Sequence, residues 1–295
     1  MINSSLLNII NSTQKKLLLN NHNIIVCMNP INITKKNSNI GKNISKFMES
    51  DFFFLRLTFL FLKNFIKFFM IYLKVFFYIL ISRPKKVIKS EIIFLSHRFE
   101  NNDNDLYFSE IKKKIKNKNH QTIYIDQLNF FNFKKKSQNL IKSHNCSLKD
   151  YKNIFGEIIN IFCEVFIFLL KSKKTEKKVI AYILSYVFST ATIKNCLIYL
   201  NLKQMINSKN SRKIIHTFEG HIYEKYLNYK FKNSMNKIEF IGYQHTGLDG
   251  YENALYYPNL EKFLPNKILC ISRVDMKIIK KKLRMKNVFS IGRHL

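Results

Sequence analysis

Two residues that could accept a proton follow two neighbouring apolar runs of the sequence. Glu219 comes just after residues 213–218, and His245 comes just after residues 238–243. Both runs have the composition of β-strands. The helical stretch 221–232 between them predicts a parallel βαβ unit, because a parallel connection needs a crossover. Ligands bind beyond the carboxyl ends of the strands in an open α/β sheet. We therefore expect Glu219 and His245 to face a common crevice.

Other polar side chains lie close to these positions along the chain. Those that we expect to reach the crevice and bind substrate are His97, His221, Glu224, Tyr243 and Gln244. Each histidine also has a structural interpretation. His97 would follow a first strand over residues 87–96 and could be a hydrogen-bonded loop residue, and His221 could cap or pack the first helical turn. Glu219 could simply favour the helix dipole, and His216, inside a strand, is expected to be structural.

Several segments of the chain resemble one protein family. They read SHRFENNDNDLYFSEIKKKIK, TFEGHIYE, IGYQHTG, YYPNLEKFLPNKILCIS and NVFSIGRHL. These segments resemble bacterial proteins of surface carbohydrate biosynthesis, which act on capsule or lipopolysaccharide and look like glycosyltransferases with two facing Rossmann-like domains. The resemblance covers roughly residues 90–128 and 180–293.

The resemblance implies a fold, a substrate class and partners. The fold would be α/β, with a Rossmann-like parallel sheet and flanking helices, as in the acceptor-side, N-terminal half of such an enzyme. A nucleotide sugar would be the donor substrate, no cofactor would be needed, and the acceptor would be a saccharide or a lipid-linked molecule. Sugar transfer needs help with the proton of the acceptor hydroxyl and positive charge or helix dipoles near the leaving phosphate. Glu219 or His245 could take that proton, and the N–H groups of the helix that begins near His221 could bind an anion.

The sequence does not indicate a metal site. A pair of aspartates of the DxD type is not found at a strand end in the central region, and Asp103 and Asp105 fall in a polar loop. The five cysteines are scattered and form no CxxC pair, so neither a disulfide framework nor a zinc site is expected.

The chain is strongly basic. Its 50 Lys and Arg residues against 19 Asp and Glu give a formal charge of +31, which favours an anionic partner such as nucleic acid or a phospholipid surface. The abundance of Lys, Asn, Ile and Phe is also typical of an AT-rich coding sequence. Nucleic-acid-binding motifs are absent, and the Phe residues lie in apolar runs, so nucleic acid is the less favoured partner. A non-catalytic membrane-bound module that binds sugar or a partner is another alternative, and sedimentation with vesicles or with RNA would separate these classes.

Residues 51–83 form a long apolar run that predicts a helix. Its basic residues Arg56, Lys63, Lys67 and Lys74 are spaced seven, four and seven apart, which places them on one narrow stripe of a helix that turns about 100° per residue. A helix lying in the membrane interface accommodates this stripe, because its cations face lipid phosphates. A spanning helix would bury Lys74 at a cost of roughly 2.5 to 3.5 kcal/mol. We expect a peripheral protein on the cytoplasmic face of the inner membrane, with a single span or a core helix as alternatives.

The remaining patterns divide the chain into four parts. Residues 1–50 predict a weakly ordered leader without the features of a signal peptide, residues 51–86 the membrane-associated helix, residues 87–286 the Rossmann-like domain, and residues 287–295 the start of a second domain. Further predicted elements are strands over 122–126, 267–272 and 287–291, helices over 106–116, 154–170, 179–207 (broken near Ser189–Thr190) and 274–284, and a linker over 130–151.

The end of the sequence carries a further expectation. In proteins of the family that the chain resembles, a strand like 287–291 leads into the domain that binds the nucleotide sugar, and such a domain needs at least roughly 100 residues. We therefore expect this chain to hold the acceptor half of a site, with any donor site supplied by another chain, and to have little or no transferase activity alone.

Overall fold

The computed structural model describes most of the chain. The described residues are 4–28, 47–48, 50–81, 90–98, 107–115, 118–126, 130–131, 140–141, 146–206, 211–234, 238–245, 255–256 and 258–292. The predicted second-domain start, residues 287–295, is described only as far as residue 292.

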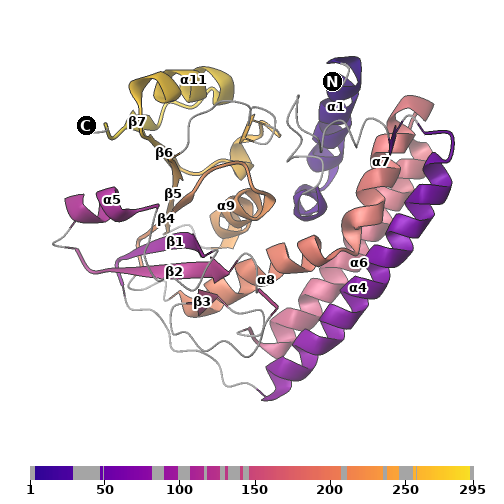
Figure 1. The fold of residues 1–295 in the computed structure, drawn as a ribbon, viewed down its shortest axis with the longest axis horizontal. Coiled ribbons are helices and arrows are strands. Elements are labelled where there is room, and N and C mark those ends of the chain that lie inside the picture. The colour runs from indigo at the N-terminus through magenta and orange to yellow at the C-terminus, as the bar shows by residue number, and fades with distance from the viewer. Residues whose placement is uncertain are drawn as a thin grey trace.

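A single all-parallel sheet organises the fold (Figure 1). Its strands are β1 (Ile92–Arg98), β2 (His120–Asp126), β3 (Leu140–Ile141), β4 (Lys213–Thr217), β5 (Glu239–Gln244), β6 (Lys267–Cys270) and β7 (Val288–Ser290). They lie in the order β3-β2-β1-β4-β5-β6-β7, and each neighbouring pair is parallel. The prediction of a Rossmann-like α/β fold is confirmed. The strand order reverses between β1 and β4, and such a reversal is the topological switch point where open α/β sheets bind ligands.

Helices cover both faces of this sheet. Strands buried on both faces are apolar throughout, which suits the runs in β1 and β4. On one face Phe94 and Ile215 pack with Ile111 of α5 (Ser109–Lys114). On the other face Ile93 and Ile214 belong to the main core. The helices that pack on this second face are α8 (Thr190–Met205), α9 (Ile222–Ser234) and α11 (Arg273–Leu283).

Three further helices form a layer beside the sheet. They are α4 (Phe53–Ile81), α6 (Leu148–Lys171) and α7 (Lys174–Val187), which run side by side at the right of Figure 1. The predicted break near Ser189–Thr190 is confirmed. The Ser189 side chain accepts a hydrogen bond from the backbone N–H of Thr192 at 3.2 Å and so caps α8, and α7 and α8 meet at an angle of 61°. The prediction of a linker over 130–151 differs from the structure, because this segment contains β3 and the first turn of α6.

The described part of the predicted leader is not weakly ordered. Residues 4–28 form α1 (Ser4–Asn20) and the 3-10 helix η1 (His22–Cys27). Leu17, Leu18, Ile24 and Ile25 are fully buried in the main core. The leader prediction is therefore wrong for residues 4–28. Of residues 29–46 nothing is described, so that part of the prediction lies outside the described residues. A short 3-10 helix, η2 (Glu261–Phe263), completes the elements used below.

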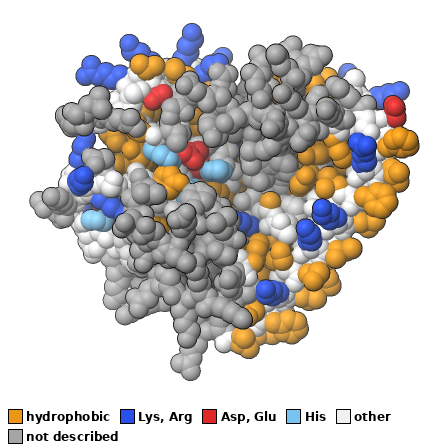
Figure 2. Space-filling view, in the orientation of Figure 1, with side chains coloured by type: hydrophobic (Ala, Val, Ile, Leu, Met, Phe, Trp, Pro, Cys, Tyr) orange, Lys and Arg blue, Asp and Glu red, His pale blue; other side chains and the backbone are white. Residues whose placement is uncertain are grey.

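The helix α4 is two-sided. Phe53, Phe68, Val75 and Ile79 bury one face of it in the main core. The opposite face exposes a continuous set of large apolar side chains: Phe54, Leu55, Phe59, Leu62, Phe65, Ile66, Phe69, Met70, Leu73, Phe77, Leu80 and Ile81. Such a surface is far larger than a soluble monomer normally exposes. The apolar and basic side chains along this edge of the molecule are visible at the right of Figure 2.

The four predicted membrane-contact residues lie along one border of that apolar face. Arg56, Lys63, Lys67 and Lys74 are all exposed, and at about 100° per residue they stand between the buried face and the exposed apolar face. Within the described residues, α4 and α6 are each long and apolar enough to cross a membrane, and α7 with α8 meets the same criterion only as a bent pair. The chain therefore has helices that can associate with or cross a membrane.

The buried position of α1 leads to a stability prediction. Leu17 is fully buried and Leu19, on the same helix, is 57% exposed. We expect Leu17→Ala to lower the free energy of unfolding by about 2 to 5 kcal/mol, because it leaves a cavity in the core. Leu19→Ala should change it by less than about 0.5 kcal/mol. Denaturant unfolding followed by circular dichroism measures both, and equal, small effects would mean that α1 does not belong to the core.

Candidate functional site

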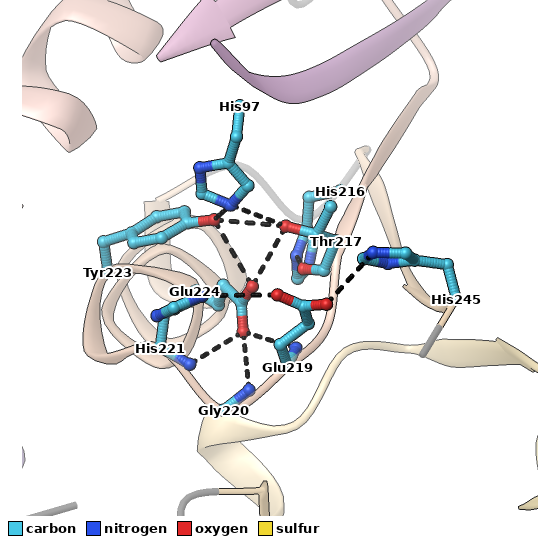
Figure 3. Close-up of polar contacts among 9 residues, drawn as sticks. All are labelled: His97, His216, Thr217, Glu219, Gly220, His221, Tyr223, Glu224 and His245. Carbon is cyan, nitrogen blue, oxygen red and sulfur yellow. Dashed lines mark hydrogen bonds and ion pairs between the residues drawn. The ribbon is translucent and has the colours of Figure 1, made fainter. Parts of the chain in front are cut away.

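A cluster of polar side chains lies at the switch point between β1 and β4. His97 near the end of β1 and Thr217 at the end of β4 come together, with 3.0 Å between His97 Nε2 and Thr217 Oγ1. The hydroxyl of Tyr223, from the first turn of α9, contacts the same His97 nitrogen. Figure 3 shows these residues converging from β1, β4 and α9. The structure thus brings His97 into the polar cluster at the switch point, and its role in binding substrate stays a prediction.

Glu224 fixes the beginning of α9. Its Oε2 accepts hydrogen bonds from the backbone N–H groups of Glu219, Gly220 and His221 at 3.0, 2.9 and 3.0 Å. Its Oε1 accepts from the hydroxyls of Thr217 at 3.1 Å and Tyr223 at 3.3 Å. A Glu three residues after the capping position commonly reaches back in this way. The carboxylate therefore ties the end of β4, the following turn and α9 into one unit.

This arrangement changes two expectations from the sequence. The N–H groups of residues 219–221 donate their hydrogen bonds to Glu224 Oε2, so they are not available to an anionic ligand. Glu224 itself is fully buried, and burial raises the pKa of its carboxyl group to about 7. The geometry thus gives Glu224 a positioning role and does not favour the predicted contact with sugar hydroxyls.

Glu219 lies between two histidines. Its Oε1 is 3.1 Å from Nε2 of His245, and its Oε2 is 3.5 Å from Nε2 of His221. The turn that presents Glu219 depends on Gly220, whose φ of 91° is a left-handed conformation that glycine adopts without strain. The predicted meeting of Glu219 and His245 is confirmed, and their catalytic roles remain predictions. His221 joins them, as the sequence analysis expected.

The pKa values of His245 and His221 are shifted in opposite directions. Burial lowers the pKa of His245, and the Glu219 charge only partly offsets this. Burial also lowers the pKa of His221, but the hydrogen bond to Glu219 and the charge of Glu224 outweigh it and leave that pKa raised. His97 is more deeply buried, and burial first, then the neighbouring cations, hold its pKa well below 6.5. At neutral pH, His97 and His245 are therefore neutral imidazoles, while His221 holds a proton more readily.

His245 has one ring nitrogen that is already engaged and one that is not. Nε2 faces Glu219, whereas the buried Nδ1 makes no hydrogen bond to any residue that the structure describes. Tyr107 packs edge-on against this ring, with centroids 4.5 Å apart, and Tyr243 lies 6.0 Å away. The imidazole is thereby held in place by a carboxylate on one edge and by aromatic rings around it.

Two of the predicted substrate-binding residues lie at the end of β5. Tyr243 is buried and packs its ring 5.7 Å from that of Phe108, and Gln244 is also buried. Tyr243 thus helps to form the wall beside His245. These positions are consistent with a place near the site, but they do not test whether Tyr243 or Gln244 binds sugar. His216 is structural as expected, since it is fully buried and lies 3.2 Å from the side-chain oxygen of Asn228.

Three members of the cluster were not found from the sequence. Thr217 and Tyr223 flank the turn at Glu219, and their positions at a strand end and in the first helical turn were the available signal. Tyr107 comes from the segment before α5. Its approach to His245 depends on how α5 packs on the sheet, which the sequence pattern does not give.

A metal ion is a chemical possibility for part of this cluster. His97, His221 and Glu224 each offer a ligand atom, and these atoms lie within 4.8 Å of one another. Glu224 and His97 already use those atoms in hydrogen bonds with Thr217, Tyr223 and the main chain. A metal ion bound here would have to replace these hydrogen bonds.

Comparison of the chain with protein-family models, with curated proteins and with solved structures gave no match. The α/β fold with its parallel sheet is therefore established from the structure itself. The resemblance to surface carbohydrate glycosyltransferases remains an interpretation of the sequence.

The buried His216 makes stability depend on pH. Burial lowers its pKa from 6.5 to about 4. Between these pH values the unfolded chain binds more protons than the folded chain. The stability that comes from keeping His216 neutral is therefore complete above its unfolded pKa and is lost as the pH falls toward its folded pKa. From about pH 7 to about pH 5, we expect the wild type to lose about 2 kcal/mol more unfolding free energy than His216→Gln. Denaturant unfolding of both chains at each pH measures this difference, and parallel pH profiles would contradict it.

Proposed function

We propose that this protein is a membrane-associated, glycosyltransferase-like protein that assists sugar transfer to a membrane-linked acceptor in cell-surface polysaccharide or lipopolysaccharide biosynthesis. The observation that carries the proposal is the Glu219–His245 pair at the carboxyl ends of the strands, next to the switch point of the sheet. The sequence resemblance supports the choice of sugar transfer among the reactions that such a pair can serve.

His245 is the general base in this proposal. A proton on Nε2 is directed at the Glu219 carboxylate 3.1 Å away, which leaves the lone pair on Nδ1. A carboxylate that orients an imidazole in this way is a recurrent arrangement for activating a hydroxyl group. Because burial lowers the pKa of His245, the imidazole is in its basic form at neutral pH. Glu219 then acts as a positioning residue.

The proposed reaction is a displacement at the anomeric carbon of a nucleotide sugar. The acceptor hydroxyl loses its proton to His245 Nδ1 as its oxygen forms the new glycosidic bond. The bond from the anomeric carbon to the leaving phosphate breaks in the same reaction, and the nucleotide keeps that electron pair. His221, with its raised pKa, contributes positive charge near the site.

The surface of α4 supports a membrane location for this reaction. Its exposed apolar face would sink below the headgroups while Arg56, Lys63, Lys67 and Lys74 contact lipid phosphates. In a spanning helix, Lys74 would lie near the bilayer centre, at a cost of about 2.5 to 3.5 kcal/mol. The same helix buries its other face in the protein core, which a lone span does not do. These facts favour a helix that lies in the interface.

The Glu219–His245 pair is tested by substitution in cells that depend on this gene. We expect His245→Gln to lower the formation of surface polysaccharide or lipopolysaccharide by about 100-fold or more, the usual size of a lost general base. Glu219→Gln should lower it at least about tenfold, and should also change the pH profile of transfer in membrane extracts, because Glu219 sets the protonation of His245.

Glu239→Gln is the matched control for Glu219→Gln. Glu239 lies at the amino end of β5, at the opposite edge of the sheet from His245, and pairs with Lys213 and Lys267. It removes the same charge and should leave glycan formation unchanged. Normal surface glycan in the Glu219 and His245 variants would refute the site, and sugar binding without turnover in any assay would favour a non-catalytic binding module.

The membrane contact is tested by reversing charge on α4. Because each cation near anionic lipid contributes about 1 kcal/mol, Lys63→Glu with Lys67→Glu should weaken binding to anionic vesicles by about 30-fold or more. The control pair Lys277→Glu and Lys281→Glu has the same spacing and charge change on exposed positions of α11, and should have little effect. Vesicle sedimentation measures this, and a double α4 variant that resists extraction at alkaline pH as the wild type does would indicate a spanning helix.

A further inference from the structure

We infer that the chain has a second binding site, away from the switch point, which takes a neutral saccharide. A groove of about 510 Å³ opens between the start of η1 and the polar side of α6. Its lining includes Asn21, Asn23, Asn153, Gly156, Glu157 and Asn160. The volume is within the range of about 300 to 1,000 Å³ that is usual for ligand sites. The inference concerns binding alone and does not depend on the proposed transfer reaction.

The η1 end of the groove is rigid and holds an unused acceptor. Asn21 caps η1 by accepting from the backbone N–H of Asn23 at 2.8 Å, and its amide group donates to Glu164 on α6 at 2.5 Å. Asn23 Oδ1 is buried and, within the part of the chain that the structure describes, has no hydrogen-bond donor. A buried polar atom of this kind normally has a partner. Because this oxygen is inaccessible to solvent, a ligand hydroxyl in the groove would supply the missing donor only after the Asn23 amide rotates toward it.

The charges around the groove favour a neutral ligand. Glu157 Oε1 accepts from Nζ of Lys230 at 2.7 Å and from the hydroxyl of Tyr226 at 3.3 Å, so this carboxylate is already compensated. Glu164 and Lys152, which also line the groove, carry opposite charges. Neither an anion nor a metal cation therefore finds a surplus of opposite charge here.

The hydrogen-bonding character of the lining fits a polyhydroxylated molecule. Asn153 and Asn160 each present an amide that can donate and accept. Glu157 adds acceptor capacity at Oε2. A sugar hydroxyl also donates and accepts, so neighbouring hydroxyls can pair with these groups in both senses. Amide-rich lining with compensated carboxylates thus points to a saccharide.

Gly156 gives an independent reason to expect a ligand. It lies in the interior of the 24-residue helix α6, where glycine costs about 0.5 to 1 kcal/mol relative to alanine. Close packing does not explain it, because a Cβ atom added there would meet nothing within 4 Å. A glycine in a helix that faces open space lets a ligand approach the main chain closely.

The full chain, reconstituted in lipid nanodiscs, is probed with an array of neutral and acidic oligosaccharides and with nanodiscs that contain neutral glycolipids. The strongest neutral binder is then titrated calorimetrically. We expect at least one neutral saccharide to bind, free or as a glycolipid headgroup, and the two arms tell these sources apart. Gly156→Leu should weaken that binding at least tenfold by filling the groove, and Asn23→Ala should weaken it several-fold.

Two comparisons make the result decisive. Gly156→Leu removes a helical glycine, so its unfolding free energy should equal or exceed that of the wild type, and lost binding would not reflect misfolding. Glu219→Gln should bind the saccharide as the wild type does, whether or not transfer occurs. The inference is overturned if no neutral saccharide binds, if Gly156→Leu binds with unchanged affinity, or if only Glu219→Gln loses binding, which would place the ligand at the switch point.

Discussion

The carboxylate of Glu224 is the contact on which the candidate site depends. It is fully buried and accepts hydrogen bonds from three backbone N–H groups and two hydroxyls. Removing it would leave these donors without their acceptor in the interior, at about 1 to 3 kcal/mol for each unsatisfied group. Because the three N–H groups belong to residues 219–221, the same carboxylate sets the direction of Glu219 and His221. The geometry of the Glu219–His245 pair is thus a consequence of how α9 begins.

Local sequence patterns predicted the sheet and the meeting of Glu219 and His245 for one physical reason. Each apolar run of β4 and β5 ends at a polar residue, and consecutive parallel strands place their carboxyl ends at one edge. That topology brings Glu219 and His245 together without further information. Tyr107 approaches His245 only because α5 packs on the sheet. Glu224 points inward because its hydrogen bonds to the main chain and to two hydroxyls outweigh the cost of burying its charge. Tertiary packing decides such contacts, and a single sequence does not encode them as a pattern.

The prediction of a weakly ordered leader was wrong for residues 4–28 because the pattern of the helix there is incomplete. The buried face of α1 includes Ile10, Thr13, Gln14, Leu17 and Leu18, which is a regular helical spacing. Two of these residues are polar, so the apolar periodicity that would reveal the helix is broken. For α4, the sequence analysis treated core packing and membrane contact as alternatives, but one face of the helix is buried in the core while another face exposes the apolar side chains that membrane contact would need. A helix with so many apolar residues has one face for the core and another that stays exposed, and the basic stripe marks the border between them.

The helix α9 also relates the two proposed binding sites to each other. Its first turn carries Tyr223 and Glu224 at the switch point. Further along α9, Tyr226 and Lys230 contact Glu157 in the wall of the groove between η1 and α6. From His221 to Lys230 the helix rises about 13 Å, at about 1.5 Å per residue. Glu157 lies on α6, which packs beside α4 and its apolar surface. A saccharide that reached from the groove to His245 would therefore extend along α9 over about this distance.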